Sequence, residues 1–62
     1  MTDRALSHAE RMEVFRALVE AQDGGTAVAL SRTVVAQRFG IAEEQVRRIE
    51  REGLDGNWPP LG

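Results

Sequence analysis

Apolar side chains recur every three or four residues in three stretches of the chain, which places them on one face of a helix. In the first stretch they are Met12, Phe15, Leu18 and Val19, and Gln22 continues the same face. In the second stretch they are Val34, Val35, Ala36 and Phe39, and in the third they are Val46 and Ile49. The pattern predicts an all-α fold of three helices joined by short links.

The first helix is predicted over residues 8–22. Ser7 and Glu10 have the spacing of a capping box, in which each side chain binds the free backbone N–H of the other residue. Gly24 and Gly25 follow the last apolar position. Because glycine readily adopts the left-handed conformation beyond a helix, we expect the helix to end there.

The second helix is predicted over about residues 32–39, after an irregular connector at 25–30. Ser31 is a favourable N-cap residue. Leu30 and Val35 flank the expected start with the spacing of a hydrophobic staple, which fixes how the chain approaches a helix. Gly40 marks its end.

The third helix is predicted over about residues 42–52, ending at Gly53 with an apolar contact from Leu54. Residues 53–62 then form a C-terminal tail that contains both prolines. Asp55 and Gly56 favour a turn, and the two prolines favour an extended polyproline II stretch.

The length of 62 residues is enough for one domain, so residues 1–62 are predicted to form a single one. The chain has no cysteine, which excludes disulfides and thiolate metal sites. The longest apolar stretch, residues 27–30, is far too short to span a membrane, and no secretory signal opens the chain. These features predict a cytoplasmic protein without a membrane partner.

The net charge is −2, from eight arginines and ten acidic residues, unlike the strongly basic composition of general nucleic-acid binders. Residues 32–51 differ from the whole chain, because they hold five arginines and three glutamates and carry a net charge of +2. Any affinity for nucleic acid is therefore expected to lie in this segment.

The link from Phe39 to Ala42 is so short that the helices on either side must cross steeply, as in a helix-turn-helix unit. The motif spans twenty positions, and Arg32 is taken as the first. It requires a small residue at the fifth position, a glycine at the ninth and a branched aliphatic residue at the fifteenth, which here are Ala36, Gly40 and Val46. Its four apolar positions are also filled, by Val35, Phe39, Ile41 and Ile49. Residues 32–51 thus resemble the helix-turn-helix of DNA-binding domains.

Within that family, the stretch from Phe39 to Glu52 is similar to the promoter-reading fourth region of bacterial sigma factors. The resemblance implies that the third helix lies in the major groove with its N-terminal residues at base edges. Glu44 and Arg48 would then face bases, and Arg47 would contact phosphate. The family often has Thr or Ser followed by a basic residue at the start of this helix, whereas this chain has Ala42 and Glu43.

The resemblance predicts sequence-specific binding to duplex DNA by a small transcriptional regulator. A homodimer would bind two half-sites about one helical turn apart. Glu43 could accept a hydrogen bond from a cytosine amino group, although it also repels phosphate. The candidate DNA-binding residues are Arg32, Glu43, Glu44, Gln45, Arg47, Arg48 and Arg51.

Two other interpretations of the same features remain open. Pairing of Glu43 with Arg47, and of Glu44 with Arg48, would make the third helix a solvated surface that binds nothing. The protein could instead dock on RNA polymerase or another nucleoprotein complex, through its helix-turn-helix face or through a tail segment made of Trp58, Pro59, Pro60 and Leu61. We expect Trp58 to fold back over the core, and the first helix offers a seam for a dimer.

No arrangement of residues suggests catalysis. His8 is the only histidine, and no second ligand stands at metal-site spacing from it. The chain shows no Ser/His/Asp arrangement and no glycine-rich phosphate loop. We therefore predict no catalytic residues, no metal, no cofactor and no enzyme activity.

Overall fold

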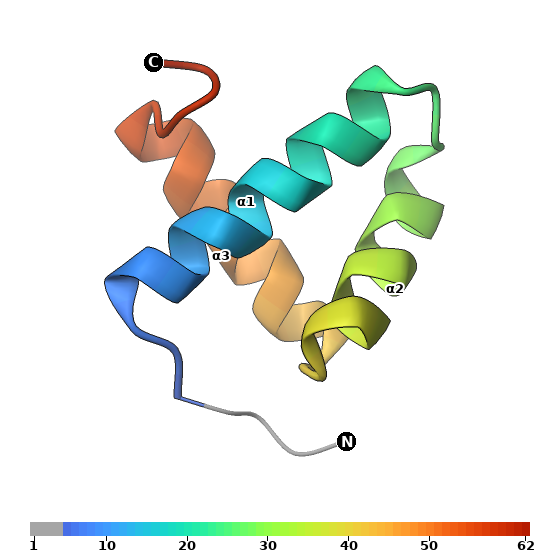
Figure 1. Cartoon of the computed structure of the whole chain (residues 1–62), viewed down its shortest axis with the longest axis horizontal. Helices are drawn as coiled ribbons and strands as arrows, with labels where there is room; N and C mark the ends of the chain where they lie inside the picture. The colour runs from blue at the N-terminus through green and yellow to red at the C-terminus, as the bar shows by residue number, and fades with distance from the viewer. Residues whose placement is uncertain (1–4) are drawn as a thin grey trace.

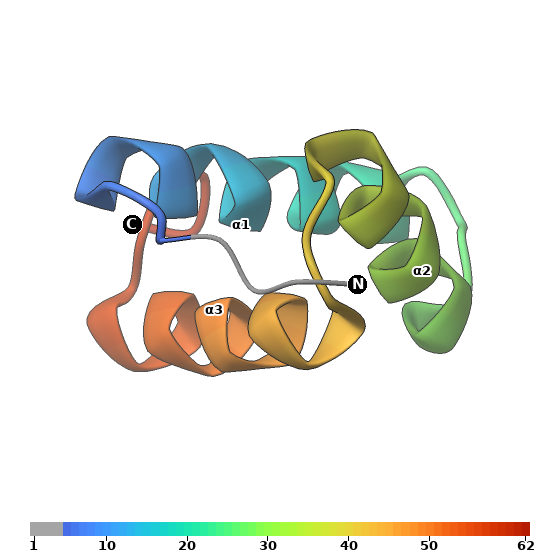
Figure 2. The same cartoon turned by 90° about the horizontal axis from the view of Figure 1, so that it is seen from below.

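The computed structural model describes residues 5–62, which form the helices α1 (His8–Asp23), α2 (Val28–Phe39) and α3 (Glu43–Gly56) (Figure 1). No strand occurs among the described residues, so the all-α class is confirmed. Figure 2 shows α1 and α3 as two layers. At one end of the molecule, α2 crosses from the layer of α3 to the layer of α1.

α1 begins where the capping box was predicted. The Ser7 backbone N–H donates to Glu10 Oε1 at 2.9 Å, and the Glu10 backbone N–H donates to Ser7 Oγ at 3.1 Å. This exchange satisfies two of the free donors at the start of the helix.

All three helices end in the same hydrogen-bond pattern, in which a residue with positive φ turns the chain and the next amide reaches back five residues. The positive-φ residues are Gly25, Gly40 and Asn57. The amides that follow are those of Thr26, Ile41 and Trp58, which donate to the carbonyls of Ala21, Ala36 and Gly53. This is the Schellman motif, which supplies donors to carbonyls that the helix leaves unpaired. The predicted ends at Gly24-Gly25 and Gly40 are confirmed.

The predicted start of α2 at Ser31 is wrong, because the helix begins one turn earlier, at Val28. Ser31 lies inside the helix and is fully buried. Its hydroxyl donates to the Val28 carbonyl at 2.6 Å and accepts from Gln22 Nε2 of α1 at 3.2 Å. Leu30 is exposed and Val35 is buried, so the expected staple does not form. Val34, expected in the core, is also exposed.

The predicted end of α3 at Gly53 is also wrong, because the helix continues to Gly56. Gly53 is buried where α3 passes over the ring of Phe15, and a Cβ at this position would overlap that ring. The residue therefore permits close packing of α3 on α1 and does not stop the helix. Leu54, expected to make a capping contact, is exposed.

The C-terminal tail turns back and is not extended as predicted. The backbone N–H of Leu61 donates to the Trp58 carbonyl at 2.9 Å, and the Pro59–Pro60 peptide bond is cis. As expected, Trp58 folds back over the core: it is partly buried and packs against it. Its ring meets that of Phe15 edge-on, with centroids 6.0 Å apart.

The core lies where the three helices meet. Its buried apolar residues are Val14, Phe15, Ala17, Leu18, Val35, Ala36, Ile41, Val46 and Ile49. Val14 was not anticipated as a core residue. Because α1 contacts both other helices, its buried face is wider than a single stripe of side chains. Within residues 5–62, no helix is both long enough and apolar enough to cross a membrane.

Candidate nucleic-acid interface

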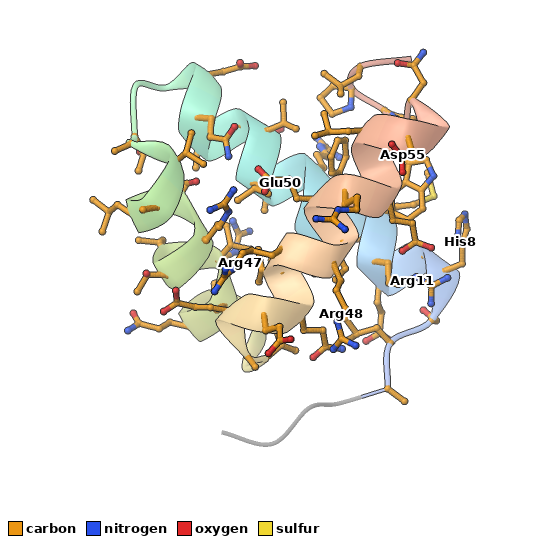
Figure 3. The ribbon with its side chains drawn as sticks, turned by 180° about the vertical axis from the view of Figure 1, so that it is seen from behind. His8, Arg11, Arg47, Arg48, Glu50 and Asp55 are labelled. Atoms are coloured by element: carbon orange, nitrogen blue, oxygen red, sulfur yellow. The ribbon has the colours of Figure 1, made fainter. Side chains whose placement is uncertain are left out.

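α3 has an inner side packed on the other helices and an outer side that faces solvent. Val46, Ile49 and Gly53 are its buried residues and define the inner side. Figure 3 looks onto the outer side, where Arg47 lies nearer α2 and Arg48 lies nearer the start of α1. The connection from α2 is only three residues long, so the start of α3 is held close to the end of α2.

Four exposed residues form a strip along the outer side of α3. They are Glu44, Arg47, Arg48 and Arg51, and together they line one open hollow. Their spacing of three or four residues places them on one helical face. Three of the four are arginines, and among the described residues no ion pair involves Arg47 or Arg51. This α3 strip is therefore locally positive in an acidic protein.

Glu43 and Glu44 are exposed in the first turn of α3, where negative charge suits the positive end of the helix dipole. Within residues 5–62, neither the Glu43–Arg47 pair nor the Glu44–Arg48 pair forms. The two glutamates thus leave Arg47 without an acidic partner on its own helix.

Gln45 lies to the side of the α3 strip. It is half-buried and lines a separate hollow beside α1, together with Arg11 and Glu52. Gln45 is therefore less exposed than the residues of the α3 strip.

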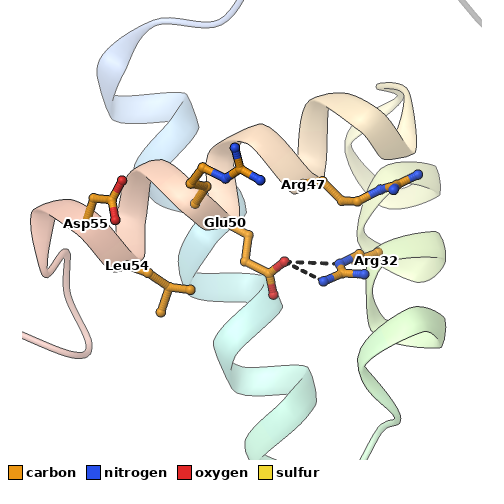
Figure 4. A pocket seen from close by; sticks show the side chains of 6 residues that line it. Arg32, Arg47, Glu50, Leu54 and Asp55 are labelled. Carbon is orange, nitrogen blue, oxygen red and sulfur yellow. Dashed lines mark hydrogen bonds and ion pairs between the residues drawn. The ribbon is translucent and has the colours of Figure 1, made fainter.

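Arg32 forms a salt bridge with an acidic residue of α3. Its Nε and Nη2 atoms donate to Glu50 Oε1 at 3.0 and 2.8 Å (Figure 4). Gln22 Nε2 of α1 donates to the other carboxylate oxygen of Glu50 at 3.4 Å. Because Gln22 also binds Ser31, one polar network joins all three helices. In this network Arg32 fixes α3 against α2.

The pairing of Glu50 affects the charge that α3 presents. Glu50 stands between Arg47 and Arg51 in the sequence, but its carboxylate is largely buried against α2. On the other flank, Glu52 pairs with Arg11 of α1, with Nε and Oε1 3.3 Å apart. Arginines of the other two helices thus neutralise two of the acidic residues of α3.

The tail residues proposed for docking lie beside α1. Trp58 contacts the ring of His8, with centroids 5.2 Å apart and the planes nearly perpendicular. Pro59, Pro60 and Leu61 are exposed. Because Trp58 already packs within the fold, it is not a free aromatic anchor. No three His, Asp or Glu side chains among residues 5–62 gather as metal ligands.

Sequence reasoning missed Glu50 and Gln22 as parts of the interface. Glu50 bonds to Arg32 across 18 residues and to Gln22 across 28. No local spacing rule covers such separations. An acidic residue between two arginines on an otherwise basic helix face was the available signal.

The chain matches none of the protein families, curated proteins or solved structures with which it was compared.

Proposed function

We propose that this protein binds duplex DNA as a small cytoplasmic transcriptional regulator. In this proposal α2 and α3 act as a helix-turn-helix unit, and α3 enters the major groove. The buried Ile41 and the left-handed Gly40 in the short turn support this role, since they hold the two helices at a close crossing.

The main support for the proposal is the distribution of charge around α3, where arginines are exposed and an acidic residue is turned inward. Among residues 5–62, Arg47 and Arg51 have no acidic partner and are exposed, whereas Glu50 is turned inward and bound to Arg32. The inward Glu50 helps to hold the helices together, and its pairing with Arg32 also leaves the outer side of α3 positive. A surface that meets phosphates gains from this, because each exposed arginine can neutralise one.

The α3 strip suggests which residues would contact bases and which would contact phosphates. Glu44 and Arg48 would reach base edges, as glutamate to cytosine and arginine to guanine. Arg47 and Arg51 would bind phosphate. Arg32 acts indirectly, by holding α3 in position through Glu50.

The test is fluorescence anisotropy of labelled mixed duplex fragments with the purified chain, at low and at near-physiological salt. We expect binding at low salt that weakens as salt rises. Arg47→Ala should lower affinity and reduce the slope of log K against log salt by about one, the effect of losing one phosphate contact.

Arg16→Ala is the matched control, because it removes the same charge from the exposed face of α1, outside the α3 strip. It should leave DNA affinity close to that of the parent chain. Absence of binding at low salt, or equal losses in Arg16→Ala and Arg47→Ala, would rule out this interface. The search would then turn to an RNA polymerase or other protein partner.

A further inference from the structure

The outward side of α2 differs from the exposed sides of the other helices because it is uncharged and holds two exposed apolar side chains. Leu30, Val34 and Gln37 are exposed at positions i, i+4 and i+7, and we call them the α2 outer face. Leu30 is 56% exposed and Val34 is 48% exposed. Exposed apolar side chains that lie together on one helix face are candidates for contact with another protein.

α1 offers no comparable surface. Phe15 is fully buried, and Val19 packs against the core, so the apolar residues expected to form a dimer seam on this helix are used inside the fold. The exposed side of α1 is mostly charged and includes Glu13, Arg16 and Glu20.

We propose that the α2 outer face binds a second copy of this chain, with the two α2 helices packed antiparallel across a twofold axis. A twofold interface brings the same surface together from both copies. With the axis midway between Leu30 and Val34, Leu30 of each copy packs on Val34 of the other. Two exposed apolar side chains per copy are thereby covered without any partner of another kind.

Charges at the ends of α2 favour the antiparallel direction. Arg38 is exposed near the end of α2, on the side that faces α1, where it lines a hollow with Glu13 and Glu20. Asp23 ends α1 and is exposed near the start of α2. Antiparallel packing brings Arg38 of one copy towards Asp23 of the other, whereas parallel packing would bring Arg38 towards Arg38.

The α3 strip lies on another helix and takes no part in this interface. Dimerisation itself does not depend on the proposed function.

Two helices of 12 residues cover less area than the roughly 1,200 Å² at which stable interfaces begin. The dimer should therefore be weak and populated at high concentration. Sedimentation equilibrium without DNA, from micromolar towards millimolar protein, should show the average mass rising from one chain towards two.

Leu30→Glu should keep the protein monomeric over this range, because it places two glutamates in an uncharged interface. Leu54→Glu is the matched control, since Leu54 is 58% exposed but lies on α3. It should dimerise like the parent chain, and circular dichroism should show unchanged helix content in both variants. Both variants stay foldable because neither residue is buried.

The antiparallel direction is tested by exchanging charges. Arg38→Asp and Asp23→Arg should each weaken the dimer, and the double variant should recover most of the loss. A parent chain that stays monomeric at the highest concentration would overturn the proposal and leave the α2 outer face to a different protein. A dimer unaffected by Leu30→Glu, or by both charge variants, would overturn it equally.

Discussion

The end of α2 and the last third of α3 each hold a glycine, and the molecule uses the two residues for opposite reasons. At Gly40 the backbone has a φ of +67°, and a Cβ would meet nothing within 4 Å. At Gly53 the backbone is helical, but the ring of Phe15 fills the space of a Cβ. Gly40 provides a backbone conformation, and Gly53 provides the absence of a side chain. Of these two glycines, only Gly40, which has a positive φ, ends a helix.

Among the glycine substitutions, Gly53→Ala should have the largest effect on stability. Alanine improves helix propensity by up to about 1 kcal/mol, but forcing a methyl group into a packed core costs about 1–3 kcal/mol. Because the ring of Phe15 fills the space of the methyl group, we take the upper end of that cost and expect a net loss of about 2 kcal/mol and a melting temperature lower by about 10 °C. Thermal unfolding followed by circular dichroism measures both. An unchanged or raised melting temperature would show that Gly53 is not a packing residue.

Truncation of Phe15 tests the contact between Phe15 and Gly53 directly. Phe15→Leu alone should destabilise the core by about 1–3 kcal/mol, because it leaves a cavity. In the Gly53→Ala background the same change should cost much less, since the added methyl group fills part of that space. A double-mutant cycle measures this coupling. Additive effects would contradict direct contact between the two positions.

Gly40→Ala should have a smaller effect than Gly53→Ala. The added methyl group meets no neighbour, so the cost is that of a left-handed alanine, about 1 kcal/mol. Gly40→Asn should recover part of this loss, because asparagine tolerates that conformation. If Gly40→Ala destabilised more than Gly53→Ala in urea unfolding, the roles assigned to the two glycines would have to be reversed.

The smallest effect is expected at Asn57, where α3 ends with a φ of +53°. Asn57→Gly should raise stability by at most about 0.5 kcal/mol, because relief of the left-handed conformation is offset by the greater freedom of glycine in the unfolded chain. Urea unfolding resolves the sign. A loss above this size would mean that the Asn57 side chain itself holds the tail.

The elements that the sequence predicted correctly depend on residues close together in the chain. Ser7 and Glu10 cap α1 across three residues, and Gly40 ends α2 by its own conformation. The errors depend on distant partners. Ser31 is drawn into α2 with Gln22 as its partner, and Gly53 is kept inside α3 by Phe15. Local spacing carries no information about such partners.

In the candidate interface, too, the features that depend on distant partners could not be predicted. Arg47, Arg48 and Arg51 were predicted as contacts from the sequence, and all three are exposed on α3. The position of Arg32 was not predictable, because its partner Glu50 lies 18 residues away. The charge on α3 can therefore be judged only when the pairing between helices is known.

The placement of the only tryptophan gives the protein a built-in optical reporter. The indole of Trp58 lies edge-on to Phe15 of α1 and follows directly after α3, so its emission should change when α3 separates from α1. It is absent from the hollow that the α3 strip lines. Tryptophan emission should thus follow unfolding and remain nearly constant during DNA titration. A variant that loses binding while its emission is unchanged has lost a contact and kept its fold.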